Sequence, residues 1–188
     1  MARQKSENKK TSQVGEVWRR LKKNKLSMVG LVIVILVVLV AIFGPWIAPY
    51  DELAQNSSER FMAPCLAHPF GTDNYGRDIL SRVIIGSRVS LLVGVVATSI
   101  ATVVGIALGA IAGYYGGRTD NLIMRFLDIF MALPNMVLAV AIAAVMNPGI
   151  TSCMIAVGVA GIPRMARTAR APVMMVRGQE YIEAATSI

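Results

Sequence analysis

The chain has 188 residues, of which 55% are hydrophobic and only 16% are charged. This composition excludes an ordinary soluble domain and indicates a chain that lies mostly in lipid. The net charge of +8 does not indicate nucleic-acid binding, because the basic residues flank apolar runs without interleaved aromatic side chains. A single histidine and two cysteines leave little from which to build a metal site or a Cys–His nucleophile. Cys65 lies in a polar segment and Cys153 in an apolar run, which favours two unpaired thiols over a disulfide.

Residues 1–25 form a basic arm with nine lysines and arginines against Glu7 and Glu16. Such an arm resists translocation, so the positive-inside rule places it in the cytoplasm. The following run, residues 26–47, has no charged residue and is long enough, at about 1.5 Å per residue, to cross a bilayer core about 30 Å thick. A cleaved signal peptide is the alternative, but the arm is long and Gly44-Pro45-Trp46 does not resemble a cleavage site. We therefore predict an uncleaved membrane-spanning helix within residues 26–48.

Residues 49–88 are predicted to be extracytoplasmic, because they follow one outward crossing and mix five acids with four arginines. Apolar residues at helical spacing within residues 78–88 predict a short helix that lies along the membrane surface. A soluble helix packed on its own loop is the alternative.

A second span is predicted over residues 89–113, which contain no ionisable residue. Small residues recur there at every fourth position, namely Ala97, Ala101, Gly105, Gly109 and Gly113. In lipid, such a stripe lets two helix backbones approach closely. The stripe therefore predicts close helix packing inside a bundle.

A third span is predicted over residues 122–146. Arg125 and Asp128 lie three residues apart near its start, and we expect them to neutralise each other. Their place in the first turns favours anchoring at the membrane interface over a proton relay. Pro134 removes a backbone donor, so a kink is expected at residues 132–134.

A fourth, short apolar stretch covers residues 150–162 and precedes a second basic cluster of Arg164, Arg167, Arg170 and Arg177. A crossing here returns the chain to the cytoplasm and leaves these arginines on the side that the positive-inside rule requires. Because the stretch is short for a span, part of residues 164–171 is expected to complete the crossing.

Two motifs lie outside the predicted spans. The first follows the first span and comprises His68, Pro69, Gly71, Thr72, Asp73, Gly76, Arg77, Asp78, Ser81 and Arg82. The second lies near residue 183 and comprises Glu180, Tyr181, Glu183, Ala184 and Ala185. The first motif resembles the signature of the inner-membrane permeases of dipeptide, oligopeptide and nickel ABC importers. The second is similar to the opening of the cytoplasmic E-A-A loop of such permeases.

This resemblance implies an all-α polytopic membrane protein with the ABC importer type I transmembrane fold. It divides the chain into the arm 1–25, a first helix 26–48, an extracytoplasmic segment 49–88 and an incomplete permease domain 89–188. The chain would contain the first four of about six spans and stop within its coupling loop, since the family's glycine would fall at position 189.

By the same resemblance, the E-A-A loop forms a coupling helix that docks in a cytoplasmic ATPase subunit. Glu183 would be the acidic contact, and Ala184 and Ala185 would keep the helix thin enough to enter. The implied partners are a second permease subunit in a heterodimer, ABC ATPase subunits, an extracytoplasmic solute-binding protein and the lipid bilayer, with no nucleic acid.

No Walker A pattern occurs in the sequence. We therefore expect no enzyme activity, cofactor or metal in this chain, and expect ATP and Mg²⁺ to be used by the partner ATPase subunits. The expected location is the cytoplasmic membrane of a bacterium or archaeon, with several crossings and a cytoplasmic N-terminus.

Two other classes are alternatives to an importer permease. An ion-coupled secondary transporter would show midplane polar or broken-helix sites repeated in a second half. A membrane anchor or assembly protein would tolerate scrambling of residues 71–78. The two motifs do not distinguish peptide, nickel and glutathione as the transported substrate.

Overall fold

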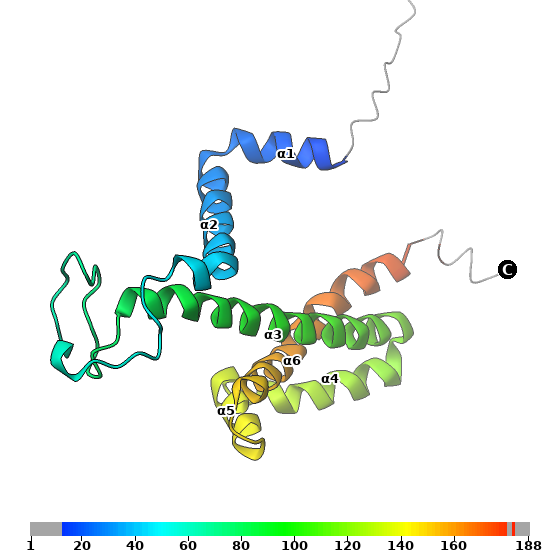
Figure 1. Ribbon diagram of the computed structural model, residues 1–188. Coiled ribbons are helices and arrows are strands. Elements are labelled where there is room, and N and C mark those ends of the chain that lie inside the picture. The colour runs from blue at the N-terminus through cyan, green and yellow to red at the C-terminus, as the bar shows by residue number, and fades with distance from the viewer. Residues whose placement is uncertain (1–12, 180–181, 183–188) are drawn as a thin grey trace, which may run out of the picture. The chain divides into compact units, whose positions relative to one another are not determined.

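A computed structural model describes residues 13–179 and 182 of the chain (Figure 1). The elements in chain order are α1 (Gln13–Lys23), α2 (Lys25–Ile47), the 3-10 turn η1 (Ser57–Glu59), α3 (Ile79–Tyr115), α4 (Gly117–Met131), α5 (Asn135–Val145) and α6 (Ile150–Arg177). The predicted all-α class is confirmed: in the described part of the chain the only β pairing is one isolated bridge between Thr72 and Asp78. The chain divides into two compact units, residues 1–88 and 89–188.

In the first unit, α1 and α2 are separated by Asn24 alone. Its side-chain oxygen accepts a hydrogen bond of 3.0 Å from the backbone N–H of Leu26 and so caps α2. α2 has 23 residues, and none after Lys25 is charged. This helix matches the predicted first span. Most of its large apolar side chains are exposed, as expected for a helix that faces lipid.

The C-terminal end of α2 packs against the start of α3 within the first unit. Gly44 is buried, and a β-carbon placed there would lie 3.3 Å from both the carbonyl oxygen and a side-chain methyl of Ile84. Pro45 follows inside the last turn, where the helix ends at Ile47. The bare backbone at Gly44 is therefore what permits this approach.

α3 is one continuous helix of 37 residues. Residues 79–88 are helical, but the expected separate short helix is not an element of its own, because no break occurs between Arg88 and Val89. Neither residue is a glycine or proline, so nothing in the local sequence stops the helix there. At a rise of about 1.5 Å per residue, α3 is considerably longer than a bilayer core of about 30 Å requires.

The predicted kink near Pro134 is present and is a full break. α4 ends at Met131, α5 begins at Asn135, and the two helices are bent by 88°. Pro134 has no N–H to donate, and its backbone is extended with φ of −55° and ψ of 132°. One of the last carbonyls of α4, that of Phe130, accepts a hydrogen bond of 3.3 Å from the N–H of Leu133 just beyond the helix end.

In the described chain, two helices, α2 and α3, are each long and apolar enough to cross a membrane. The number of candidate spans rises to three if the bent pair of α4 and α5 forms a single span. α6 does not meet this criterion, because arginines interrupt its apolar stretch. The predicted count of four crossings therefore stays a prediction.

In the second unit, α6 lies along α3 and runs in the same direction. A β-carbon added at Gly158 would lie 3.1 Å from the carbonyl oxygen of Ala97, and one added at Gly113 would lie 2.8 Å from the carbonyl oxygen of Arg170. Earlier residues of α3 thus contact earlier residues of α6, and later residues contact later ones. α4 and α5 connect the end of α3 to the start of α6. Because α3 and α6 are parallel, this connection returns the chain from the end of α3 to the level at which the contact begins.

Candidate functional site

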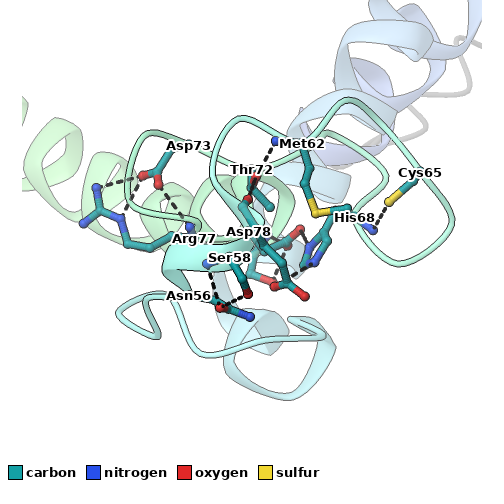
Figure 2. Close-up of polar contacts among 11 residues, drawn as sticks. Asn56, Ser58, Met62, Cys65, His68, Thr72, Asp73, Arg77 and Asp78 are labelled. Carbon is teal, nitrogen blue, oxygen red and sulfur yellow. Dashed lines mark hydrogen bonds and ion pairs between the residues drawn. The ribbon is translucent and has the colours of Figure 1, made fainter.

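The motif between α2 and α3 is built around the carboxylate of Asp73 (Figure 2). One of its oxygens accepts hydrogen bonds from the backbone N–H groups of Tyr75 at 2.8 Å and Arg77 at 3.0 Å. The other oxygen accepts from the guanidinium groups of Arg77 at 2.8 Å and Arg82 at 2.7 Å. Asp73 therefore closes the turn at residues 73–77 and also joins it to the first turn of α3.

The two glycines of this motif occupy positions that no other residue fits. Gly71 and Gly76 have φ of +74° and +72°, in the left-handed region that favours glycine. A β-carbon at Gly76 would lie 1.8 Å from the carbonyl oxygen of Asn56, and one at Gly71 would lie 2.4 Å from that of Met62. The chain of residues 56–62 therefore passes directly over the motif.

Thr72 holds the overlying segment, residues 56–62, in place through hydrogen bonds. Its hydroxyl accepts a hydrogen bond of 2.9 Å from the N–H of Met62 and donates one to the carbonyl of Glu59. The N–H of Thr72 also donates to the carbonyl of Met62 at 3.1 Å. Thr72 is 5% exposed, so these bonds are shielded from water.

A buried network surrounds the start of α3. One oxygen of Asp78 lies 3.0 Å from Nδ1 of His68, and the other accepts from the N–H and the hydroxyl of Ser81, both at 2.7 Å. The Ser81 oxygen in turn accepts a bond of 3.1 Å from the N–H of Tyr50, whose ring stacks on His68 at 4.8 Å between centroids. Asp78 thus caps α3 and ties it to the end of α2.

The environment of both carboxylates shifts their pKa values. Burial alone would raise the pKa of Asp73, but the hydrogen bonds from the backbone of Arg77 and Tyr75 and from the Arg77 side chain outweigh it and lower the pKa to about 2. For Asp78, burial again acts to raise the pKa, and the hydrogen bonds from Ser81 and His68 lower it below its usual value. Both groups are therefore held as carboxylates at neutral pH.

This arrangement stabilises structure and is not that of a nucleophile. Asp78 accepts from Ser81 and also contacts His68, so the hydroxyl of Ser81 is bonded to the carboxylate and not to the imidazole. A serine nucleophile requires its base within hydrogen-bond reach. In the described residues every buried side-chain nitrogen and oxygen atom has a hydrogen-bond partner. The motif holds the C-terminal end of α2 and the start of α3 together.

The small-residue stripe of the second unit faces α6. Ala97 and Ala101 are buried, and Ala166 on α6 is fully buried. A β-carbon at Gly105 would lie 2.5 Å from the β-carbon of Met165, and one at Gly109 would lie 2.2 Å from the carbonyl oxygen of Ala166. The backbones of the two helices are therefore in direct contact along the stripe.

Two ion pairs join α4 to α6. Arg170 donates from both sides of its guanidinium to Asp120, each bond 2.5 Å long, and Arg167 donates to Asp128. The expected pairing of Arg125 with Asp128 is therefore wrong. Spacing of three residues permits such a pair on one helix, but α6 packs against α4 and supplies a different cation.

A cavity of about 430 Å³ lies between α3, α5 and α6, and no feature of the sequence pointed to it. The break at Pro134 places the first turn of α5 beside the middle of α3, so three helices border an open cavity. Its polar side chains are Thr98, Asn135 and Arg164, and the rest of its lining is apolar. The E-A-A residues Glu180, Tyr181, Glu183, Ala184 and Ala185 lie outside the described residues.

These features define a helical membrane protein with a closely hydrogen-bonded loop between α2 and α3 and a closely packed helix bundle. Two family models match its sequence. Residues 12–64 match the N-terminal transmembrane domain of oligopeptide transport permease C. Residues 105–188 match the inner membrane component of binding-protein-dependent transport systems.

Curated relatives agree with these matches. The chain is 42% identical over 170 residues to a dipeptide transport system permease protein of Alkalihalophilus pseudofirmus, with 90% of this chain and 56% of the relative covered. It is 41% identical over 169 residues to a probable D,D-dipeptide transport system permease protein of Escherichia coli K12, with 90% and 56% covered. It is 44% identical over 174 residues to a glutathione transport system permease protein of another Escherichia coli strain, with 92% and 57% covered.

The chain therefore belongs to the inner-membrane permeases of binding-protein-dependent ABC transport systems. It is a multi-pass α-helical membrane protein, and the relatives that it matches are named as transport permeases and not as enzymes. It spans about 56% of the length of the first two of these relatives.

Proposed function

We propose that the chain is part of the permease subunit of an ATP-driven importer that moves short peptides across the cytoplasmic membrane. The observation that carries this proposal is the identity of 41–44%, over 90% or more of the chain, to permeases named for dipeptide, D,D-dipeptide and glutathione transport. The same relatives favour a peptide over nickel as the substrate. The permease itself performs no chemistry and acts by alternating access between two states of the bundle.

The topology proposed for the chain has a cytoplasmic N-terminus and four crossings. The parallel contact of α3 and α6 supports it, because a helix that lies along a membrane-spanning helix in the same direction crosses in the same sense. The pair α4 and α5 then provides the return crossing between them. In this proposed topology the motif between α2 and α3 would lie on the extracytoplasmic side, and residue 183 would lie in the cytoplasm with the arginines of α6, as the positive-inside rule favours.

The proposed partners follow from this topology. A cytoplasmic ATPase pair would bind the E-A-A loop through Glu183, Ala184 and Ala185, and would use ATP and Mg²⁺ while this chain binds no cofactor. A second permease subunit would complete the pathway, and an extracytoplasmic solute-binding protein would deliver the peptide. The two ion pairs between α4 and α6 would make these helices move as one body when the ATPases close.

A disruption in the host organism tests the proposal. Removal of the gene should abolish ATP-dependent uptake of a labelled dipeptide, and the wild-type gene should restore it. A gene carrying Glu183→Lys should give a subunit that inserts normally but supports neither uptake nor substrate-stimulated ATP hydrolysis, because the acidic contact is reversed. Normal uptake in the disrupted strain would refute the proposed transport, and normal uptake with Glu183→Lys would refute the assigned coupling contact.

A further inference from the structure

The helix that precedes the first span, α1 (Gln13–Lys23), lies beside the membrane because of its connection to α2. Asn24 alone separates the two helices, and α2 carries no charge from Leu26 to Ile47. The backbone of Asn24 is extended, with φ of −102° and ψ of 109°, so α1 ends there and does not continue along the axis of α2 (Figure 1). Since α2 is long and apolar enough to cross a bilayer, the last turn of α1 is held next to the point where the apolar run begins.

α1 has one apolar and one basic side. Its apolar residues occur at positions 14, 17, 18 and 21, and this spacing of three and four is that of one side of a helix. Trp18 is 47% exposed, and Leu21 is partly buried. Arg19 and Lys23 are four residues apart on the opposite side and are both exposed. A tryptophan on the apolar side of a short basic helix is typical of helices that lie in the plane of a membrane surface.

The basic side of α1 has no counter-charge in the described part of the chain. Residues 19–25 contain five lysines and arginines and no acid. Among the side chains that the structure describes, no ion pair involves the cations of this segment, Arg19, Lys22, Lys23 and Lys25. The Nζ of Lys22 lies 5.2 Å from the centroid of the Trp18 ring, so this charge is at the border between the apolar and basic sides. These charges are available to an anionic partner.

We propose that α1 lies on the bilayer surface, with its apolar side between the lipid chains and its basic side bound to the headgroups of anionic phospholipids. A lysine or arginine close to an anionic membrane surface favours binding by about fivefold, and α1 brings several of them to one place. In the proposed topology this surface belongs to the cytoplasmic leaflet. The positive-inside rule requires only that the basic arm stays on one side, whereas this proposal gives α1 a ligand. It goes beyond the proposed transport function and does not depend on it.

A protein subunit is the alternative partner for an exposed amphipathic helix, and two observations favour lipid instead. First, Trp18 is only eight residues before Leu26, so the apolar side of α1 lies within two helical turns of the membrane-spanning run. Second, the exposed charges of the segment are all positive, and the phosphodiester groups of anionic lipids supply the opposite charge at this same surface. Insertion of α2 therefore brings α1 next to this partner without any further assembly.

The first test measures the contact of Trp18 with each lipid. The chain has two tryptophans, so Trp46→Phe leaves Trp18 as the only one. The full chain is reconstituted in vesicles of phosphatidylcholine and phosphatidylglycerol in which one lipid or the other is brominated, because bromine quenches an adjacent indole. Brominated phosphatidylglycerol should quench Trp18 as though it were enriched about fivefold around α1, and about 0.5 M salt should weaken this preference. The control is Trp18→Phe, which retains Trp46 near the end of α2 and should show no preference.

The second test, in the Trp46→Phe chain, asks whether the charges of α1 cause the preference. Lys22→Gln combined with Lys23→Gln should at least halve the preference for brominated phosphatidylglycerol, because two of the charges that attract it are removed. Arg60→Gln combined with Arg88→Gln is the matched control. It removes the same charge from two exposed positions outside α1 and should leave the preference unchanged.

Three results would overturn the inference. Equal quenching of Trp18 by the two brominated lipids would show that α1 touches the bilayer without binding anionic headgroups. Quenching by neither lipid, with full access of aqueous acrylamide to Trp18, would show that α1 projects into water, where a protein subunit could cover it. An equal loss of preference in the two charge variants would show that the net charge of the chain, and not α1, attracts the lipid. None of these results bears on transport, which the uptake measurements test separately.

Discussion

The contact between α3 and α6 predicts a sharp difference between two glycines of the same helix. A β-carbon at Gly109 would lie 2.2 Å from the carbonyl oxygen of Ala166, whereas one at Gly94 would meet no atom within 4 Å. An ordinary contact requires at least 3.4 Å, so Gly109→Ala must separate the helices by about 1.2 Å. The obstructing atom belongs to the backbone, so no side-chain rotation can relieve the clash.

We expect Gly109→Ala to lower the free energy of unfolding by about 1–3 kcal/mol, the usual range for overpacking a close contact. Gly94→Ala should be neutral or slightly stabilising, because alanine favours a helix by up to about 1 kcal/mol over glycine. The assay is unfolding of the detergent-purified protein by increasing SDS, followed by circular dichroism. Equal stability of the two variants would refute the close contact of α3 and α6 at this position.

Three further predictions concern the outer motif and the ion pairs. Gly76→Ala should destabilise the protein in the same SDS assay, because its β-carbon would overlap a backbone carbonyl at 1.8 Å in a left-handed conformation. The pKa of Asp73 is lowered from its ordinary value of 3.8 to about 2 in the folded state, so the stabilisation that this carboxylate provides is present above pH 3.8 and is lost as the pH falls through about 2. Asp73→Asn should remove this part of the acid dependence, and an unchanged acid profile would contradict it. Asp120→Asn should lower stability by about 1–2 kcal/mol, since it removes the negative charge and one of the two oxygens that accept from the partly exposed Arg170. Asp128→Asn changes a pair that is exposed on both sides and should lower stability by less than about 1 kcal/mol. Equal losses for the two variants would contradict the difference.

The elements with strong local signals could be predicted from the sequence. An uncharged run after a basic arm predicted α2 almost to the residue, since the structure begins it at Lys25 and ends it at Ile47. The donor missing at Pro134 predicted the break between α4 and α5. The spacing of small residues predicted a closely packed partner for α3, and the contacts at Gly105 and Gly109 show that this partner is α6.

The features that depend on distant contacts could not be predicted in this way. The change from charged to uncharged residues at residue 88 suggested two helices, but such a change alters the environment of a helix without ending it, so α3 continues. The spacing of three residues predicted that Asp128 pairs with Arg125, whereas its partner in the structure is Arg167, which is 39 residues away in the sequence. The motif identified His68, Asp78 and Ser81 as a set, but only the folded loop shows that Asp78 bonds to both of the others.

The candidate site was likewise predictable only in part. The motif residues of the loop between α2 and α3 form a recognisable sequence pattern, and the structure shows that their hydrogen bonds hold α2 and the start of α3 together. The cavity was not predictable, because its polar residues Thr98, Asn135 and Arg164 are far apart in the sequence and belong to three different helices. None of them forms part of a recognisable motif. Only the break at Pro134 and the parallel contact of α3 and α6 bring them to one space.

The proposed role of this chain is that of a subunit of a peptide importer driven by ATP. The most direct measurement is uptake of a labelled dipeptide into proteoliposomes that contain the complete transporter, with the solute-binding protein on the peptide side and the nucleotide on the ATPase side. We predict uptake that requires hydrolysable ATP, that is unaffected when the proton and sodium gradients are collapsed, and that Glu183→Lys abolishes. Uptake driven by an ion gradient without ATP, or ATP hydrolysis with no peptide movement by the intact complex, would contradict the account.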